Sequence, residues 1–420
     1  MIDFDRNYSL ILRKQSILSK FMICLVPNIG STSFKYRLLD IAKDVKILAQ
    51  GRVERIGQPG SACGDYPAAI RQCIADIAGP GRPLKSLAEV DAVGFKAVHA
   101  GPCITSQIID DEFLASMEEF SFIAPAHNPP YIAAIKAFRE ELPGVPLVAV
   151  LETAPYARMS EAATTFAVPH AWREKSGIRR YGFHGASHRS ASERTQELMQ
   201  RTDLRHISCH LGGSSSLAAF RDGIAQDTSF GTSPQSGLPQ NNRVGDIDVF
   251  AVLHMMKKLG LGPDQMAALL ASRSGLAGIS GGSGDVRDLS DAASQGDARS
   301  RLALDVFVYA IRHYLGAFLV SLVGVDVITF SGGIGENSRE IRSAILKDLS
   351  AFGIELDDQK NQSISGEGTI SADSSAVRVM VIPANEEMIV ARETAAIVSQ
   401  RQAAPSNAVQ PAVLAESVQG

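Results

Sequence analysis

The feature that most constrains the fold is a pair of similar segments about 180 residues apart. Residues 22–40 contain an apolar run, a turn rich in Gly and Ser, and a second run with alternating apolar residues, and residues 206–223 repeat this order. Apolar runs on both sides of a small-residue turn are typical of two paired strands. Two such pairs in one chain predict a duplicated domain.

Strands and helices alternate through the rest of the chain, which predicts the α/β class. Apolar residues at helical spacing predict helices over residues 66–77 and 131–142 and several more after Asp246. Further strands are predicted over residues 46–57, 91–101, 145–152, 325–331 and 376–382, and the fourth of these runs into a Gly-rich turn.

Composition excludes several classes of protein. The chain has 420 residues, of which 45% are hydrophobic and 20% charged, and its net charge of −4 argues against a dedicated binder of nucleic acid or of a membrane surface. No apolar run approaches the roughly 20 residues of a membrane span. Five cysteines without metal-ligand spacing indicate a reduced cytoplasm. At about 150 residues per domain, the length suggests two or three domains.

The two ends of the chain differ from its centre. Residues 1–21 mix charges with short apolar runs and lack the features of a signal peptide, so we expect a poorly ordered extension. Residues 401–420 are rich in Ala, Pro, Gln and Ser and are expected to form a disordered tail.

Three turns of small residues follow apolar strands, at residues 28–35, 210–216 and 331–337. Glycine lets the backbone approach a phosphate closely, and N–H groups and hydroxyls can then donate to it. Three such turns in one chain favour a phosphate cradle for a nucleotide. None matches the P-loop pattern, and no G-x-G-x-x-G opens a helix after the first strand.

Basic and imidazole side chains gather in Gly- or Pro-flanked loops, where they could neutralise a phosphoryl group in transfer. They are Lys96, His99, His127, Arg179, Arg180, His184, His188 and Arg243. Carboxylates that packing does not explain, and that could hold Mg²⁺, are Glu152, Asp227, Asp246 and the pair Glu386–Glu387. Asp285 fits a helix cap better, unless its loop faces a nucleotide.

Taken together in this order, the motifs resemble those of the acetate kinase family, the acetate, propionate and butyrate kinases, from about residue 22 to 398. The matching segments are NIGSTSFK at 28–35, APAHNP at 124–129, RRYGFHGASH at 179–188, HLGGSSS at 210–216, GDVRD at 284–288, GGIGEN at 332–337 and PANEE at 383–387.

The resemblance implies a fold and a division of the chain. It implies two duplicated ribonuclease H-like, actin-like ATPase domains with the active site in the cleft between them. Domain I would comprise residues 22–170 and 387–400, and domain II, which binds the nucleotide, residues 171–386. A homodimer in the cytoplasm, without nucleic acid or membrane as partner, is also expected.

The resemblance also implies roles for individual residues. His184 and Arg243 would stabilise the transferred phosphoryl group, His127 would be an active-site histidine, and Asn28 and Glu386 would serve the metal. Val98, Phe183 and Pro234 would line the acyl pocket. The ATP-binding residues would be Ser31, Ser33, Lys35, His210, Leu211, Gly212, Gly213, Ser214, Asp285, Val286, Arg287, Gly333, Ile334, Gly335, Glu336 and Asn337.

The chain departs from the family pattern within the site itself. Lys96 stands where the family has a substrate-binding arginine, and Glu152 where it has a catalytic aspartate. Lys keeps the charge but loses the planar fork that grips a carboxylate. Ala126 replaces a leucine of the acyl pocket, and Gly213 an asparagine.

The expected reaction is transfer of the γ-phosphoryl group of ATP to acetate in the presence of Mg²⁺, with Mn²⁺ as a possible substitute. Two alternatives stay open because of the departures in the site. One is a kinase for a larger acid, propionate or butyrate. Ala126 would leave space in the acyl pocket, and each additional methylene buried there contributes about 0.8 kcal/mol. The other is a nucleotide-binding relative with impaired catalysis.

Overall fold

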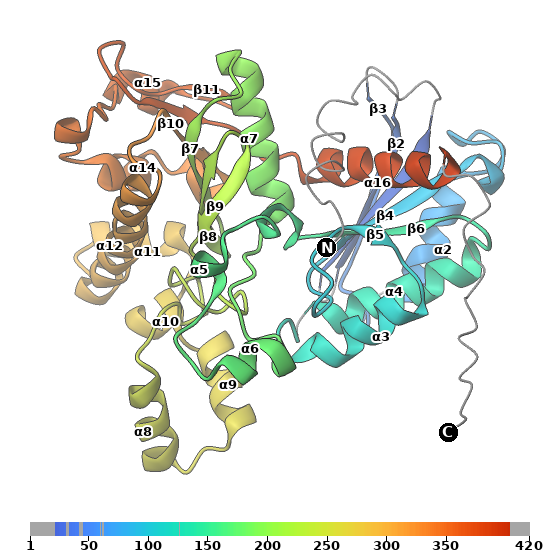
Figure 1. Ribbon diagram of the computed structural model, residues 1–420, viewed down its shortest axis with the longest axis horizontal. Coiled ribbons are helices and arrows are strands. Elements are labelled where there is room, and N and C mark those ends of the chain that lie inside the picture. The colour runs from blue at the N-terminus through green and yellow to red at the C-terminus, as the bar shows by residue number, and fades with distance from the viewer. Residues whose placement is uncertain are drawn as a thin grey trace, which may run out of the picture.

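The first of the two units of this computed structural model is built on a mixed six-stranded sheet (Figure 1). The structure describes residues 22–30, 33–41, 45–58, 60, 63–125 and 127–403. The strand order is β3-β2-β1-β4-β6-β5, in which β1, β4 and β6 are parallel and the other pairs antiparallel. The strands are β1 (Ile23–Ile29), β2 (Ser33–Asp40), β3 (Lys46–Glu54), β4 (Ala92–Ala97), β5 (Gln107–Ile108) and β6 (Leu147–Leu151).

The second sheet repeats the topology of the first. Its order is β9-β8-β7-β10-β12-β11, again with three central parallel strands and antiparallel pairs outside them. A register shift between the second and third strands also occurs in both sheets. The predicted duplication is therefore confirmed. The strands are β7 (Arg205–Leu211), β8 (Ser215–Arg221), β9 (Ile224–Thr228), β10 (Val327–Ser331), β11 (Gly368–Thr369) and β12 (Arg378–Val381).

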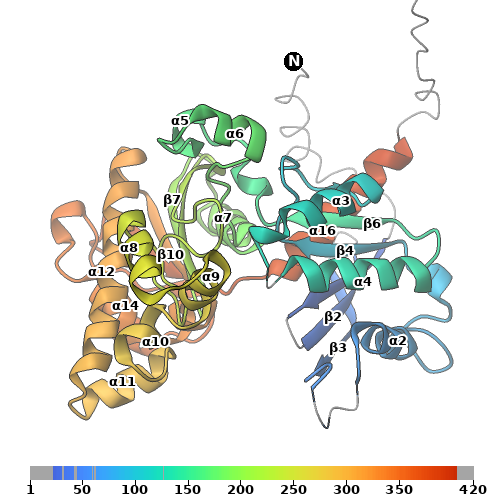
Figure 2. The same cartoon turned by 90° about the horizontal axis from the view of Figure 1, so that it is seen from below.

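Helices cover both faces of the first sheet because its parallel strands are apolar on both faces. Helices α2 (Tyr66–Ile77), α3 (Asp111–Glu119) and α4 (Asn128–Glu141) pack on one face, where residues such as Leu25 and Phe95 meet them. Helix α16 (Glu386–Ala403) packs on the other face with Val390 and Ala395. Figure 2 shows α16 and α4 on opposite sides of β4. The last helix of the chain thus belongs to the core of the first sheet.

The second sheet lies between α7 (Gly185–Met199) and a layer of helices on its other face. That layer consists of α10 (Gly275–Ser280), α11 (Val286–Ser294), α12 (Ala298–Ser321) and α14 (Arg339–Leu346). Helices α8 (Val249–Leu259) and α9 (Pro263–Ser272) project from this unit (Figure 1). Shorter helices are α5 (Glu161–Thr164), α6 (His170–Ser176), α13 (Gly332–Asn337) and α15 (Asp358–Ser363), with 3₁₀ turns η1 (Leu87–Glu89), η2 (Phe120–Phe122), η3 (Ala154–Tyr156) and η4 (Ser350–Phe352).

Helix α12 contradicts the expectation that no apolar segment approaches the length of a membrane span. Its 24 residues are long and apolar enough to cross a membrane, by length and composition. One such helix is weak evidence for a span. One side of α12 is buried against the second sheet and its neighbouring helices through residues that include Phe307, Ile311 and Phe318.

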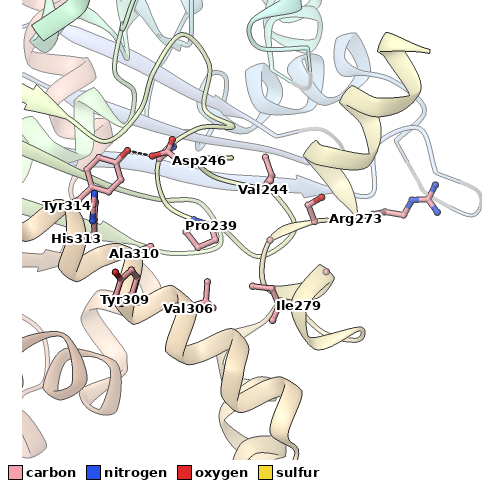
Figure 3. Close-up of a pocket in the computed structure, with 14 residues that line it drawn as sticks. Pro239, Val244, Asp246, Arg273, Ile279, Val306, Tyr309, Ala310, His313 and Tyr314 are labelled. Carbon is pink, nitrogen blue, oxygen red and sulfur yellow. Dashed lines mark hydrogen bonds between the residues drawn. The ribbon is translucent and has the colours of Figure 1, made fainter. Parts of the chain in front are cut away.

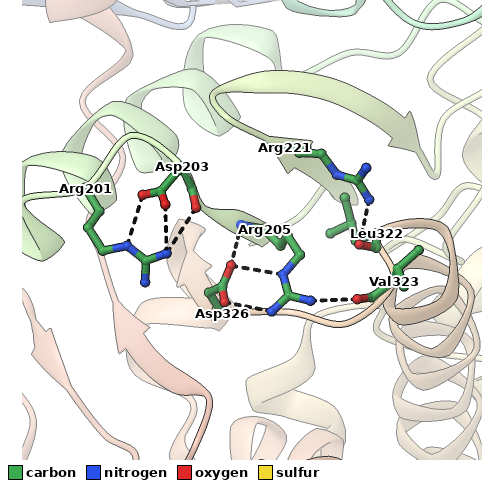
Figure 4. A network of polar contacts seen from close by, with 7 residues as sticks. All are labelled: Arg201, Asp203, Arg205, Arg221, Leu322, Val323 and Asp326. Carbon is green, nitrogen blue, oxygen red and sulfur yellow. Dashed lines mark hydrogen bonds and ion pairs between the residues drawn. The ribbon is translucent and has the colours of Figure 1, made fainter.

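Arginine–carboxylate pairs fix the start of the central strands in the second sheet (Figure 4). The guanidinium of Arg205, at the start of β7, donates to both carboxylate oxygens of Asp326, just before β10, at 3.1 and 2.8 Å. It also donates to the carbonyl of Val323 at 2.6 Å, and Arg221 donates to that of Leu322. The segment after α12 is thereby tied to the start of β7 and the end of β8, and Asp326 joins the starts of β7 and β10.

Three details differ from the sequence-based predictions. The Gly-rich segment after β10 is the short helix α13, not an open turn, and the helix predicted from Tyr131 begins at Asn128. Residues 401–403 of the predicted tail continue α16. The remainder of that tail, the extension at 1–21, and Ser31 and Ala126 lie outside the described residues.

The domain boundaries remain a prediction, but the contacts of turn η3 are informative about the boundary predicted at residue 170. Turn η3 packs against β9 and α7 of the second unit, and Tyr156 and Met159 share a buried cluster with Phe220. These contacts favour a boundary close to Thr153, earlier than the predicted residue 170.

Candidate functional site

The predicted charged residues of the first unit meet at the carboxyl ends of its parallel strands. Lys96 lies near the end of β4, and Glu152 directly follows β6, where its backbone N–H bonds the carbonyl of Ala97 at 2.9 Å. Glu386 is the first residue of α16 and reaches Lys96, with 2.5 Å between Lys96 Nζ and Glu386 Oε2. Both side chains are about one fifth exposed, at 23% and 19%. The folded chain thus brings together residues that lie 290 positions apart.

Burial and charge act in opposite directions on this pair. Burial alone would lower the pKa of Lys96, but the carboxylates of Glu386 and Glu152 outweigh it and raise that pKa. Burial alone would raise the pKa of Glu386, but the Lys96 ammonium holds it below its usual range. Lys96 and Glu386 are therefore both charged around neutral pH, as an ion pair.

Glu152 is the third member of this group, and in its case the opposing interactions do not outweigh burial. Its side chain is 5% exposed, and its Oε1 atom is buried without a hydrogen-bond partner among the described residues. Burial raises the pKa of Glu152 to about 7, although Lys96 opposes the shift. A buried carboxylate oxygen without a donor is costly, and a bound cation would satisfy it.

A close approach between the two units places α7 beside these carboxylates. A Cβ atom added at Gly185, the first residue of α7, would lie 2.1 Å from the carbonyl oxygen of Glu152. Only glycine fits there, since no side-chain carbon comes so close to a backbone oxygen. His184, which precedes it, is thereby brought to the same edge as Lys96 and Glu152.

The histidines of the second unit form a buried group around His184. This residue has a left-handed backbone (φ 56°), which is uncommon for a residue other than glycine. Its Nδ1 atom lies 2.8 Å from Ser216 Oγ, and its ring centroid 4.4 Å from that of His210. Burial, and then the neighbouring His210 and His188, lower the pKa of His184 well below its usual value. The imidazole is neutral around pH 7.

Arg243 and His127 lie near the same group. The guanidinium of Arg243 donates to Ser214 Oγ at 3.3 Å and to Gln240 Oε1 at 3.3 Å, which holds it beside the turn at 212–214. Burial, and then the charges of Arg243 and Lys96, lower the pKa of His127 to about 4. His127 is therefore a neutral donor or acceptor rather than a cation.

Two of the predicted acyl-pocket residues belong to one apolar cluster. Val98 and Phe183 are buried together with Ile123, Ala124 and Phe230. The backbone carbonyl of Pro234 accepts from Gln240, so its loop is tied to the Arg243 side of the site. Ala126, the predicted enlargement of this pocket, lies outside the described residues.

The three nucleotide loops are built differently from one another. Gly212 and Gly213 turn β7 into β8, and a Cβ at Gly212 would lie 3.9 Å from Gly333 N, so the β7–β8 turn adjoins α13. In the first unit, Asn28 of β1 and Lys35 of β2 lie opposite each other in the β1–β2 hairpin. Ser33 begins β2. Among the other predicted nucleotide residues of the second unit, His210 and Leu211 end β7, Ser214 lies in the turn after it, and α13 contains Ile334, Gly335, Glu336 and Asn337.

Asp285 is the N-cap of α11, as the alternative interpretation held. Its Oδ1 accepts from the backbone N–H of Arg287 at 2.9 Å, and its carboxylate also pairs with the Arg287 guanidinium. These contacts occupy the carboxylate within its own turn. Val286, the first residue of the helix, is buried in the core of the second unit.

A cavity of about 600 Å³ lies next to the loop that carries Arg243, but Arg243 does not line it (Figure 3). Val244, Asp246 and residues of α12 form its walls. Asp246 accepts hydrogen bonds from Tyr314 Oη and from the backbone of Gly237. This carboxylate, a candidate in the sequence, supports the loop instead of joining the charged group.

Sequence reasoning missed two polar residues that contact the predicted site. Gln240 accepts from both Ser214 and Arg243, and Ser216 connects His184 to His188, a histidine that the sequence had already singled out. Both missed residues lie inside or beside the motifs. The i, i+4 spacing of His184 and His188 in the helix could have indicated that the two rings share a face.

The comparisons with known proteins agree with one another. The model described as the Acetokinase family matches residues 23–392. An acetate kinase of Desulforamulus reducens is 42% identical over 399 residues, which cover 90% of this chain and 100% of that relative. An acetate kinase structure from Porphyromonas gingivalis has a TM-score of 0.82 at 36% identity, and a propionate kinase structure from Francisella tularensis the same TM-score at 30% identity; each match covers 90% of this chain and 100% of the other.

Glu152→Gln tests the burial of the carboxylate. Because the pKa of Glu152 rises from 4.5 to about 7 on folding, the folded protein binds its proton more tightly than the unfolded chain. This tighter proton binding contributes up to about 3 kcal/mol to the free energy of unfolding. The contribution is fully present below pH 4.5 and is lost as pH rises through 7. Wild type should therefore lose stability relative to Glu152→Gln between pH 5 and 8.

The measurement is the Tm of both proteins across this range without divalent metal or nucleotide. Glu387→Gln, a neighbouring change that retains Glu152, should follow the wild-type slope. Parallel curves for wild type and Glu152→Gln would contradict the interpretation.

Proposed function

Because the chain belongs to the acetokinase family, we propose that it transfers the γ-phosphoryl group of ATP to acetate, reversibly, to give acetyl phosphate and ADP. The chain is a phosphotransferase with a carboxylate as acceptor. The choice of site rests on one observation: Lys96, Glu152 and Glu386 lie together beside His184. They do so at the carboxyl ends of the parallel strands, where α/β folds bind ligands.

Each of these residues has a task that fits its surroundings. Lys96 orients the acceptor carboxylate, which approaches the γ-phosphorus in line with the leaving ADP. Arg243 and His184 donate to the equatorial phosphoryl oxygens, where negative charge spreads in the transition state. The loops at residues 210–216, 284–288 and 332–337 hold the nucleotide. Positioning and charge neutralisation supply most of the rate, since phosphoryl transfer needs little covalent chemistry from the protein.

The carboxylates fit a metal that is shared with a nucleotide. Within the described ranges, no group of three or more His, Cys, Asp or Glu side chains is arranged to hold a metal ion. Mg²⁺ is usually held by one or two carboxylates together with substrate phosphates and water, which matches Glu386 and the unsatisfied Glu152. Asn28, near the carboxyl end of β1, would assist. When bound, Mg²⁺ (or Mn²⁺) would neutralise charge on the phosphates.

A larger acid is the second candidate acceptor. The propionate kinase from Francisella tularensis matches this chain with the same TM-score as the acetate kinase from Porphyromonas gingivalis. The acyl end of the substrate would meet Val98 and Phe183, whose cluster is apolar. The chain length of the acid therefore depends on the space that this cluster leaves.

A hydroxamate assay with ATP, Mg²⁺ and straight-chain acids of two to five carbons tests the proposal. We expect acetate to give the highest kcat/KM, and His184→Asn to lower kcat with acetate by about 10²- to 10³-fold, the usual loss of one transition-state donor. A higher kcat/KM with propionate or butyrate would favour the larger acid. No acyl phosphate from any acid would make the chain an impaired relative.

Lys96→Arg and Glu152→Asp, alone and together, test whether the two departures from the family pattern compensate each other. Because Lys96 and Glu152 interact within one buried charge group, each single change should lower kcat/KM about tenfold, and the double variant should regain most of it. Losses that simply multiply in the double variant would show that the two residues act independently.

We also propose a cytoplasmic homodimer that forms through α8. Cys24, Cys73, Cys103 and Cys209 are free thiols, which suits a reducing compartment. Helix α8 buries none of its residues, and its apolar side chains include Val249 (60% exposed), Phe250 (76%) and Leu253 (54%). A contiguous apolar face of this kind marks an interaction surface. A second copy of the chain, presenting the same helix, would cover it.

Sedimentation velocity tests this interface. Wild type should sediment as a dimer and Phe250→Asp/Leu253→Asp as a monomer, because two carboxylates would have to be buried in the contact. Phe352→Asp changes a similarly exposed residue (60%) outside α8 and should remain dimeric. A monomeric wild type, or a dimeric double variant, would refute the proposed interface.

A further inference from the structure

Three buried polar side chains form a continuous hydrogen-bonded chain that ends at the partly exposed His184. Ser208 Oγ lies 2.8 Å from His188 Nδ1, and His188 Nε2 lies 2.8 Å from Ser216 Oγ. Ser216 Oγ in turn lies 2.8 Å from His184 Nδ1. Ser208, His188 and Ser216 are 0% exposed, whereas His184 is partly exposed. The order of the chain is therefore Ser208, His188, Ser216, His184.

The secondary structure places these side chains on one interface. His184 and His188 are separated by one helical turn at the start of α7, so they share a face. Ser216 of β8 is the register partner of His210 in β7, and Ser208 lies two residues from His210, so both serines point to the same side of the sheet. Helix α7 packs on that side.

The proton positions along this chain depend on one another. Burial lowers the pKa of both His184 and His188 well below the usual value, so each neutral ring has one N–H and one acceptor nitrogen. Ser216 has a single hydroxyl proton to share between two ring nitrogens. If it donates to one ring, the other ring must donate to it. The tautomer of His188 thus determines that of His184.

Ser208 decides between the two possible directions. Its hydroxyl makes a hydrogen bond to His188 and, within the described part of the chain, to no other group. If His188 Nδ1 carried the proton, the Ser208 hydroxyl would accept, and its own proton would be buried without an acceptor. If Ser208 donates to Nδ1, the protons of the three fully buried residues, Ser208, His188 and Ser216, all have acceptors, which buried polar groups require. His188 then carries its proton on Nε2 and donates to Ser216.

We propose that Ser216 and His188 are positioning residues that fix His184 in the tautomer with its proton on Nε2, ready to donate to the transferring phosphoryl group. Ser216 donates to His184 Nδ1, which leaves Nε2 as the only N–H of that ring. Nε2 has no hydrogen-bond partner among the described residues. The donation from His184 Nε2 to a phosphoryl group rests on the proposed function, whereas the tautomer of His184 does not.

The backbone at His184 supports an orienting role. The residue holds a left-handed conformation at the N-cap of α7 and makes no capping bond with its side chain. Strained conformations of this kind persist where the surroundings hold them in place, often at functional sites. Here the hydrogen bond to Ser216 and the packing of Gly185 against Glu152 hold the ring from two sides.

The tautomer is measured directly by long-range ¹H–¹⁵N correlation NMR of the full-length protein labelled with ¹⁵N-histidine, without nucleotide. Loss of one set of signals in His184→Asn assigns His184. We expect a single neutral form of wild-type His184 with the proton on Nε2. A proton on Nδ1, or a mixture of both forms, would overturn the proposal. This readout does not depend on kinase activity.

Kinetics of variants supply the second test. Ser216→Ala should lower kcat about tenfold with less than a twofold change in KM for ATP, and its His184 should populate both tautomers. Ser216→Thr keeps the hydroxyl and should retain wild-type kcat and a single tautomer. His188→Gln can still donate to Ser216 and should lower kcat less than His188→Leu.

Thr329→Val is the matched control. Thr329 Oγ1 lies 2.8 Å from His206 Nε2, a buried hydroxyl–imidazole pair in the same sheet that does not include His184. The variant should keep wild-type kcat and the wild-type His184 signals. An equal loss of kcat in Thr329→Val and Ser216→Ala would refute the positioning role. Failure of every carboxylate as acceptor would instead refute the proposed function, while the NMR result would stand by itself.

Discussion

The contact on which the arrangement of the site depends is the packing of α7 against the end of β6, where Gly185 meets the carbonyl of Glu152. It joins the two sheets at their functional edges, so that the carboxylates of one unit face the imidazoles of the other. Helix α16 starts at the same junction and adds Glu386. Any side chain at position 185 would separate these groups, and the site would lose its geometry before it lost a single charged residue.

The charges at this junction are arranged for ligands rather than for stability. Lys96 and Glu386 neutralise each other, but Glu152 remains as a buried acid with an unsatisfied oxygen. A buried charge of this kind costs stability unless a partner completes it. The proposed partner of Glu152 is a metal ion that arrives with the nucleotide. This proposal explains why a well-packed protein would keep a buried acid with an unsatisfied oxygen. The proposed binding of nucleotide with its metal would therefore complete the charges of this group.

The sequence predicted local elements and motifs better than the contacts between residues that lie far apart along the chain. The two hairpins were recognisable because each pairs apolar strands across a small-residue turn. Helix α2 was predicted at its observed bounds because its apolar spacing is a local signal. The motifs predicted the members of the site, but local patterns do not contain the pairing of Lys96 with Glu386, 290 residues away. They also do not distinguish a helix cap such as Asp285 from a ligand, or reveal the hydroxyl of Ser216 between two histidines. Such contacts depend on the register of the strands and on how the helices pack against the sheets.

The position of α16 has a consequence for synthesis of the protein on the ribosome. Met22, just before the first strand, and Cys24 and Val26 within it are buried against Val390 and Ala391 of the last helix. Domains generally fold as units during synthesis, the earliest first. In this chain one face of the first unit stays uncovered until nearly the whole polypeptide has been made, while the second unit can already assemble from contiguous sequence. The part that is translated first is thus the last to be completed, and the nascent chain must keep an apolar sheet face soluble in the meantime.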